Sequence, residues 1–139
     1  MRSAKSTRLI IPIVLLGLLI SQPGLASPRC LELTVSQRLK SATAVFTGEV
    51  LAVGPVEHFL ETRFKVLEIF KGTVATELRV STNSNSAETP RFEPGRTYLV
   101  FAHSHDGRLM AGACAGTVEI QYAKQAISKL RRLTRNRKG

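Results

Sequence analysis

The sequence has no tryptophan, and its few aromatic residues make up 6% of the chain. Proteins that bind single-stranded nucleic acid stack the bases on exposed aromatic side chains. Here Phe46, Phe64 and Phe101 lie in strand-like runs, at positions expected to face a core. We therefore do not expect nucleic acid as a partner.

The sequence also lacks a recognisable catalytic motif. No serine, cysteine or carboxylate occupies the nucleophile or general-base position of a known motif. Glu61, Glu68 and Glu77 lie in runs with basic residues, a pattern typical of solvated strand faces. We expect a protein that is not an enzyme and that needs no cofactor.

Histidine is scarce, with 3 in the whole chain. His103 and His105 would share one face of a strand and could form a metal site with His58. However, the strand that carries His103 is expected to end there, and His58 lies at the far end of another strand. We expect solvated loop histidines and no metal site.

Only one long apolar run is present, from Leu9 to Ile20. It would span about 18 Å as a helix, which is short of the ~30 Å bilayer core. Arg2, Lys5 and Arg8 precede the run, and small residues follow it up to Ala26. This order is typical of a secretory signal peptide. We expect cleavage after Ala26, which leaves Ser27, Pro28 and Arg29 ahead of the first cysteine, and a protein that is soluble in the periplasm or outside the cell.

The chain has only two cysteines, Cys30 and Cys114. In an exported protein such a pair is expected to form a disulfide. A disulfide that closes the loop between residues 30 and 114 would stabilise the fold by about 4 kcal/mol, because it lowers the conformational entropy of the unfolded chain. A reactive thiol or a metal site is the alternative, and no histidine lies at ligand spacing to support it.

Basic residues exceed acidic residues by 20 to 10, and the excess is local. The body of the domain is close to neutral, whereas the C-terminal stretch holds Lys124, Lys129, Arg131, Arg132, Arg135, Arg137 and Lys138. A basic stretch of this kind favours a polyanion nearby, such as an anionic membrane face or a cell-wall polymer. A solvated helix face remains the alternative.

Two segments are expected to be helical. In the run from Cys30 to Ser41, Thr34 is a candidate N-cap with Gln37 in the capping-box position. The run from Tyr122 to Arg135 carries an apolar stripe at helical spacing, formed by Ala123, Ala126, Ile127, Leu130 and Leu133.

Between these helices the sequence predicts five strands. They cover residues 45–53, 58–70, 76–82, 97–103 and 108–112. In the first, Phe46, Val50 and Ala52 are expected to share one face. The run 97–103 is apolar on both faces, which favours a central strand. Near Val66 the apolar positions change face, which requires a β-bulge or a change of sheet. Asp106-Gly107 predicts a tight hairpin. The number of strands favours a mainly β domain, with a closed or nearly closed five-stranded barrel between the two helices.

Several motifs together resemble a known family. They are the early cysteine Cys30, VFTGEV from Val45, VLEIFKG from Val66, FEPGRTYLVFA from Phe92 and ACAGT from Ala113. In this order they resemble the bacterial relatives of the tissue inhibitors of metalloproteinases, which share the netrin-like OB-fold. The resemblance covers Cys30 to about Leu133 and implies an OB-fold barrel.

The resemblance also implies a site. In animal members, the α-amine and carbonyl oxygen of an N-terminal cysteine bind the zinc of a metalloprotease, and the next side chain enters the specificity pocket. Carried over, Cys30 would be the zinc ligand, Leu31 the pocket residue and Cys114 the disulfide partner of Cys30. An α-amine with a pKa of about 8 can lose its proton and bind a metal at neutral pH.

Two functions therefore remain open. The first is a secreted inhibitor of a zinc metalloprotease, acting through Cys30 and Leu31. The second is a binding module held to an anionic envelope surface by its basic helix. In both cases we expect a signal peptide at 1–26, one domain at 27–135 and a basic tail at 136–139.

Overall fold

The computed structural model describes residues 30–73, 75–86 and 89–137. The predicted signal peptide lies outside these residues. The described part is mainly β, with α1 (Val35–Ser41), β1 (Ala44–Val56), β2 (Phe59–Lys71), β3 (Glu77–Asn83), β4 (Thr97–His105), β5 (Arg108–Met110), β6 (Val118–Glu119) and α2 (Lys124–Arg135). Two short 3-10 turns, η1 (Ala113–Ala115) and η2 (Ile120–Tyr122), lie between β5 and α2. No helix in these residues has the length and apolar character needed to cross a bilayer.

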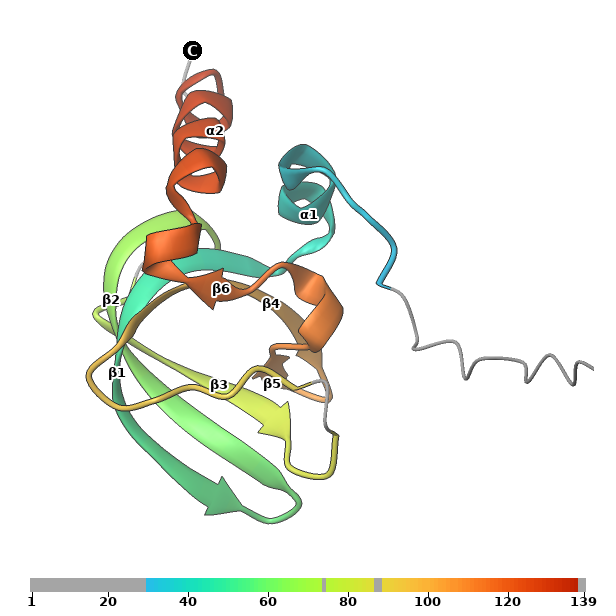
Figure 1. The fold of residues 1–139 in the computed structure, drawn as a ribbon, viewed down its shortest axis with the longest axis vertical. Helices are drawn as coiled ribbons and strands as arrows, with labels where there is room; N and C mark the ends of the chain where they lie inside the picture. Colours follow the sequence, from blue (N-terminus) through green and yellow to red (C-terminus); the bar gives the residue numbers. More distant parts are fainter. Residues whose placement is uncertain (1–29, 74, 87–88, 138–139) are drawn as a thin grey trace, which may run out of the picture.

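Five of the strands form a closed ring of hydrogen-bonded pairs (Figure 1). The order around the ring is β1-β2-β3-β5-β4, and β4 pairs again with β1. All pairs are antiparallel except β3–β5, which is parallel. The short β6, which the sequence did not predict, pairs with β4 outside the ring. Both α-helices lie at the same end of the ring, opposite the tip of the β1–β2 hairpin.

The inside of the ring is filled by a first apolar cluster. Its centre is a chain of edge-to-face aromatic contacts. The ring centroids are 5.5 Å apart for Phe46–Phe64, 5.0 Å for Phe64–Phe92 and 5.0 Å for Phe92–Tyr98. This geometry is the one that aromatic pairs prefer, and each ring buries a large apolar area. The few aromatic residues of the chain are thus concentrated where they hold the strands together.

A second apolar cluster lies between the ring and the two helices. Leu39 of α1 and Ile127 and Leu130 of α2 pack there against side chains from the strands. This confirms the apolar stripe predicted for α2, since Ala123 is buried with them and Ala126 and Leu133 are packed against the cluster. The capping box is also confirmed, so α1 begins after Thr34 and residues 30–33 form no helix.

β4 contributes to both clusters. Tyr98, Val100 and Ala102 belong to the first cluster, whereas Leu99 and Phe101 belong to the second. Successive side chains of a strand point to opposite faces, so a strand that is apolar at every position suits burial on both faces. The sequence predicts a central strand here, and the structure confirms it.

The predicted change of face in β2 is a bulge at Leu67. Thr47 pairs with Glu68 and Gly48 with Val66, so Leu67 has no partner on β1. Leu67 is 55% exposed as a result. Two further irregularities, at Phe70 of β2 and at Leu51 of β1, were not predicted. The one at Leu51 leaves Ala52 exposed and packs Val53 against the first cluster, so the expectation that Ala52 shares the buried face of Val50 was wrong.

The strand ends differ from prediction most clearly in β1. The sequence places its end at Gly54-Pro55, but the strand continues to Val56 and turns into β2 at Glu57, which has φ 55°. After Val50, β1 pairs with β2 on one side, and its other edge pairs with no strand among the described residues. A proline, which has no N–H to donate, is tolerated on such an edge.

Substitution of Gly48 should destabilise the fold. A Cβ atom on Gly48 would lie 3.1 Å from ring or Cβ atoms of Phe46 and Phe64. Overpacking of this kind costs about 1–3 kcal/mol. We expect G48A to lower the free energy of unfolding by that amount, measured by urea denaturation.

Gly54 in the same strand provides the matched control for Gly48. A Cβ atom there would meet nothing within 4 Å. G54A should therefore unfold within about 0.5 kcal/mol of the unchanged protein. Equal midpoints for G48A and G54A would contradict the packing described for Gly48.

Candidate functional site

The segment that carries Cys30 and Leu31 is fixed at both of its ends. Cys30 forms a disulfide with Cys114 of η1, with the two Cα atoms 5.0 Å apart, which confirms the predicted pairing. At the other end, Gln37 Oε1 accepts a hydrogen bond from Thr34 N at 2.9 Å, and Thr34 Oγ1 accepts one from Gln37 N at 3.2 Å. We call residues 30–33 together with Cys114 the Cys30 edge.

Leu31 lies between these two anchors and projects into solvent. Its side chain is 75% exposed, one of the two highest values among the large hydrophobic residues that the structure describes. A single exposed leucine is ordinary on a protein surface. Leu31 differs because a covalent bond and a helix cap restrict the backbone on either side of it.

Two hollows flank the disulfide. One, of about 350 Å³, lies between the segment that follows β3 and the segment that follows β5, and Asn83, Thr89 and Met110 are in its wall. The other, of about 290 Å³, lies between α1 and η1, and Arg38, Ser41 and His103 are in its wall. Cys114 borders both. The edge is thus a ridge with depressions on two sides.

A hollow of about 460 Å³, larger than the two beside the disulfide, lies at the β2 bulge. It is bordered by apolar side chains, including Val66, Leu67 and Ile69. Its one titratable lining residue, Glu68, is already paired with α2. Among the residues that the structure describes, this hollow brings together no group of chemically reactive side chains.

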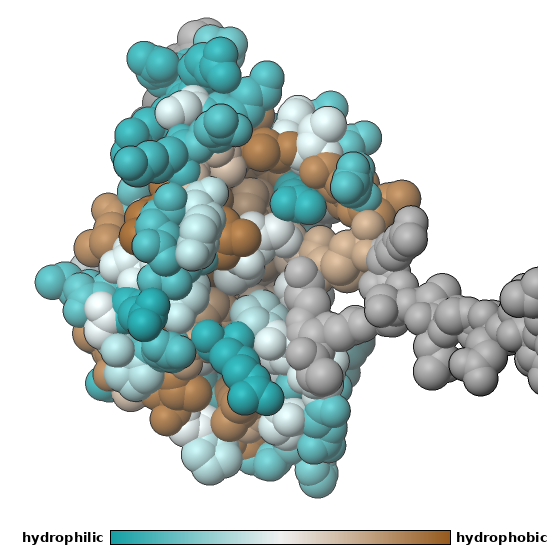
Figure 2. All heavy atoms as spheres, viewed as in Figure 1, coloured by the Kyte–Doolittle hydropathy of each residue, from teal (hydrophilic) through white to brown (hydrophobic). Residues whose placement is uncertain are grey.

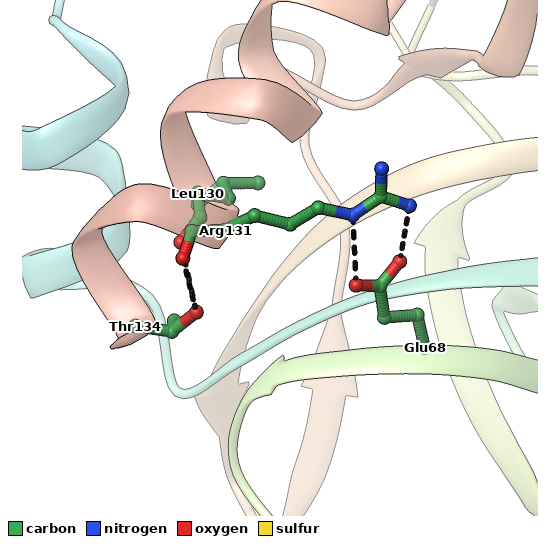
Figure 3. A network of polar contacts seen from close by, with 4 residues as sticks. All are labelled: Glu68, Leu130, Arg131 and Thr134. Atoms are coloured by element: carbon green, nitrogen blue, oxygen red, sulfur yellow. Dashed lines mark hydrogen bonds and ion pairs between the residues drawn. The ribbon is translucent and has the colours of Figure 1, made fainter. Parts of the chain in front are cut away.

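The basic surface predicted on the last helix divides into paired and unpaired residues. Arg131 forms a two-pronged contact with Glu68 of β2, from Nε to Oε1 at 3.0 Å and from an Nη atom to Oε2 at 2.9 Å (Figure 3). The hydrogen bond and the charge of Glu68 raise the pKa of Arg131 above its ordinary value. The same contact ties the side of α2 to the ring of strands.

The other cations of α2 have no such partner. Within the described part of the chain, no carboxylate forms an ion pair with these residues, which are exposed: Lys124, Lys129, Arg132 and Arg135. Hydrophilic side chains cover α2 at the top of Figure 2.

The cations of the strand ring, in contrast, are mostly paired. Arg63 and Arg79 each contact a glutamate of the neighbouring strand, and Arg108 contacts Glu57 of the β1–β2 turn. Arg96 contacts both Glu119, at 2.9 Å, and Glu93, at 2.7 Å, and these contacts raise its pKa. Lys71 donates to the carbonyl oxygens of Leu39 and Lys40, both at 2.9 Å, near the end of α1. Within the described residues, α2 thus carries the largest group of basic residues without a carboxylate partner. Basic residues of α1 and of the strand ring with its loops that also form no ion pair there are Arg38, Lys40, Lys65 and Arg91.

The two predicted sites lie apart. Cys30, Leu31 and Cys114 are brought together, whereas the basic residues lie on α2, and α1 separates the two in Figure 1. His103 borders the hollow beside α1, and His58 lies at the β1–β2 turn. The described residues contain no group of three or more His, Cys, Asp or Glu side chains that could hold a metal.

Sequence reasoning missed the hollows beside the disulfide, and with them Arg38. The wall of the second hollow comes from α1, β4 and η1, which are far apart in sequence. A lone arginine in a short amphipathic helix gives no signal of this kind. The one available signal was the disulfide itself, which brings residues 30 and 114 together.

Comparison with known proteins adds no assignment. No protein-family model matches the chain, and no curated protein matches it.

Loss of the disulfide should destabilise the domain. The bond closes a loop with a sequence separation of 84. Removing a cross-link that closes a long loop costs about 2–4 kcal/mol. We expect this loss of unfolding free energy in the double variant C30S/C114S, measured by urea denaturation.

The unchanged protein in a reducing agent is the matched comparison for C30S/C114S. Its midpoint should fall to that of the double variant. Coincident midpoints for the oxidised protein and the double variant would show that the bond does not stabilise this fold.

Proposed function

We propose that this chain is an exported protein-binding module that inserts its Cys30 edge into the cleft of a partner, and that the partner is a zinc metalloprotease. The observation that carries the proposal is Leu31, which is 75% exposed beside a cysteine held by a disulfide. A preorganised segment loses little conformational entropy on binding. More of the free energy gained by burying its exposed apolar side chain therefore appears as affinity.

The fold supports a distant relationship to the tissue inhibitors of metalloproteinases. We propose that the closed ring of five strands is an OB-fold barrel of the netrin-like kind. Three motifs of the resemblance fall on the ring: VFTGEV on β1, VLEIFKG at the end of β2 and TYLVFA on β4. The late cysteine lies in η1, where it reaches the start of the domain.

The position of the mature N-terminus decides the chemistry at the zinc. A chain that starts at Cys30 presents an α-amine, which binds a metal when it is not protonated. A chain that starts at Ser27 presents an amide nitrogen at Cys30, and Leu31 is then the group that binds. Intact mass and N-terminal sequencing of the exported protein, with and without a reducing agent, separate the two cases.

Inhibition should depend on Leu31. Burying a leucine side chain is worth about 1.5–3 kcal/mol, which corresponds to a change in inhibition constant of roughly 10- to 150-fold. We expect L31E to weaken inhibition by at least that factor, measured against a panel of zinc metalloproteases. No inhibition by the unchanged protein across the panel would refute the proposal.

Leu67 gives the matched control for Leu31, because it is also an exposed leucine, at 55%, but lies at the β2 bulge away from the Cys30 edge. L67E should inhibit as well as the unchanged protein. Equal weakening by L31E and L67E would point to a general effect of charge.

A second candidate function is supported by the unpaired cations of α2. We propose that Lys124, Lys129, Arg132 and Arg135 hold the protein to an anionic polymer or membrane face of the envelope. Cations that neutralise no internal carboxylate are free to replace the counterions of a polyanion. Such binding weakens as salt shortens the Debye length to about 3 Å at 1 M.

Retention on an anionic matrix should distinguish free from paired arginines. We expect R132Q to elute at lower salt than R131Q, since Arg131 already contacts Glu68 and Arg132 contacts no carboxylate among the described residues. Both variants remove one charge, so the comparison tests local contact. If R131Q eluted at lower salt than R132Q, the assignment of polyanion binding to the unpaired basic residues of α2 would be overturned.

A further inference from the structure

The hollow between α1 and η1 is lined by charged, polar and apolar side chains to which the proposed function assigns no role. Its wall combines the cation Arg38 and the polar side chains of Ser41 and His103 with the apolar groups of Leu33 and Ala115. The volume is about 290 Å³, enough for one side chain of a partner. It borders Cys114 and therefore adjoins the Cys30 edge.

Arg38 has no counter-ion within the described part of the chain. No carboxylate there, Glu32 included, forms an ion pair with Arg38. Its Nε atom is buried and makes no hydrogen bond. A buried donor without an acceptor lowers the stability of the fold. The protein thus keeps a guanidinium at the wall of a hollow without supplying an acceptor for that atom.

The glycine that ends η1, Gly116, leaves room for this guanidinium. Gly116 has φ 92°, a left-handed conformation that glycine adopts more easily than other residues. A Cβ atom on Gly116 would lie 2.8 Å from Arg38 Cδ and 2.9 Å from Arg38 Cζ. The absence of a side chain at 116 therefore permits the observed position of Arg38.

We propose that this hollow binds a carboxylate, carried by an acidic side chain of a protein partner, with Arg38 as the binding cation. The planar fork of a guanidinium matches a carboxylate in geometry and charge. Leu33 and Ala115 suit the aliphatic part of the same side chain. A phosphate carries more charge than a single arginine balances, so the lining favours the carboxylate.

This proposal rests on the proposed function, because the hollow borders Cys114 and Leu31 follows Cys30, the two cysteines of the disulfide. A partner that covers Leu31 would therefore also reach the hollow, and we expect it to place its carboxylate there. The test, however, uses small molecules and no protease. Failure of the hollow to bind and failure of inhibition are therefore separate results.

The test is a titration of the ¹⁵N-labelled exported protein, followed by the amide signals of Ser41, His103 and Ala115. The probes are N-acetylglutamic acid α-amide, with a side-chain carboxylate, and N-acetylglutamine amide, which is neutral. N-acetylglutamine, with a terminal carboxylate, and inorganic phosphate complete the set. We expect saturable shifts with the first probe, at a dissociation constant of about 1–10 mM, and none with the neutral amide.

Variants assign the binding to Arg38. We expect R38Q to weaken binding of the glutamic acid probe at least about tenfold, because it removes a charge-assisted hydrogen bond. R38K keeps the positive charge but loses the planar guanidinium, so its affinity should lie between that of the unchanged protein and that of R38Q. R132Q, on the exposed face of α2, should bind as the unchanged protein does. If R38Q does not fold, the glutamic acid and neutral probes still decide the matter in the unchanged protein.

Three results would overturn the proposal. The first is equal shifts with the charged and neutral probes, and the second is unchanged affinity in folded R38Q. The third is tighter binding of phosphate than of either carboxylate. Binding of the terminal carboxylate in preference to the side-chain carboxylate would overturn the assignment to an acidic side chain.

Discussion

The burial of β4 on both faces is the constraint on which the other elements depend. One face completes the aromatic cluster inside the ring, and the other supplies Leu99 and Phe101 to the cluster beneath the helices. Because a strand alternates its side chains, a change of register by one residue would exchange the two sets. The ring and the helices are therefore positioned by the same strand.

The candidate sites follow from this arrangement. Leu39 anchors α1 in the second cluster, and Lys71 holds the carbonyl end of that helix, so the helix cap at Thr34 has a fixed position. The Cys30 edge starts from that cap. On the other helix, Ile127 and Leu130 take the buried side, while Arg131 pairs with Glu68. The remaining cations of α2 are exposed to solvent because the apolar residues of the helix take the side that faces the cluster.

The sequence predicted features that depend on local patterns. The cap at Thr34, the two-sided burial of β4, the bulge near Val66, the stripe of α2 and the disulfide all follow from spacing or composition. It did not predict the extension of β1 through Pro55, because the tolerance for proline depends on which strand edge is free. Nor did it predict the pairing of Arg131 with Glu68 or the hollow at Arg38, since these require elements that are distant in sequence to be placed together.

The disulfide has a consequence for the integrity of the chain. It joins residue 30 to residue 114 and so places α1, the five strands of the ring and the segments between them inside one covalent loop. Hydrolysis of a single peptide bond within that loop, for example in the polar segment after β3, leaves the two pieces joined through sulfur. After such a cut the chain would remain one molecule, and separating its pieces would also require reduction of the disulfide.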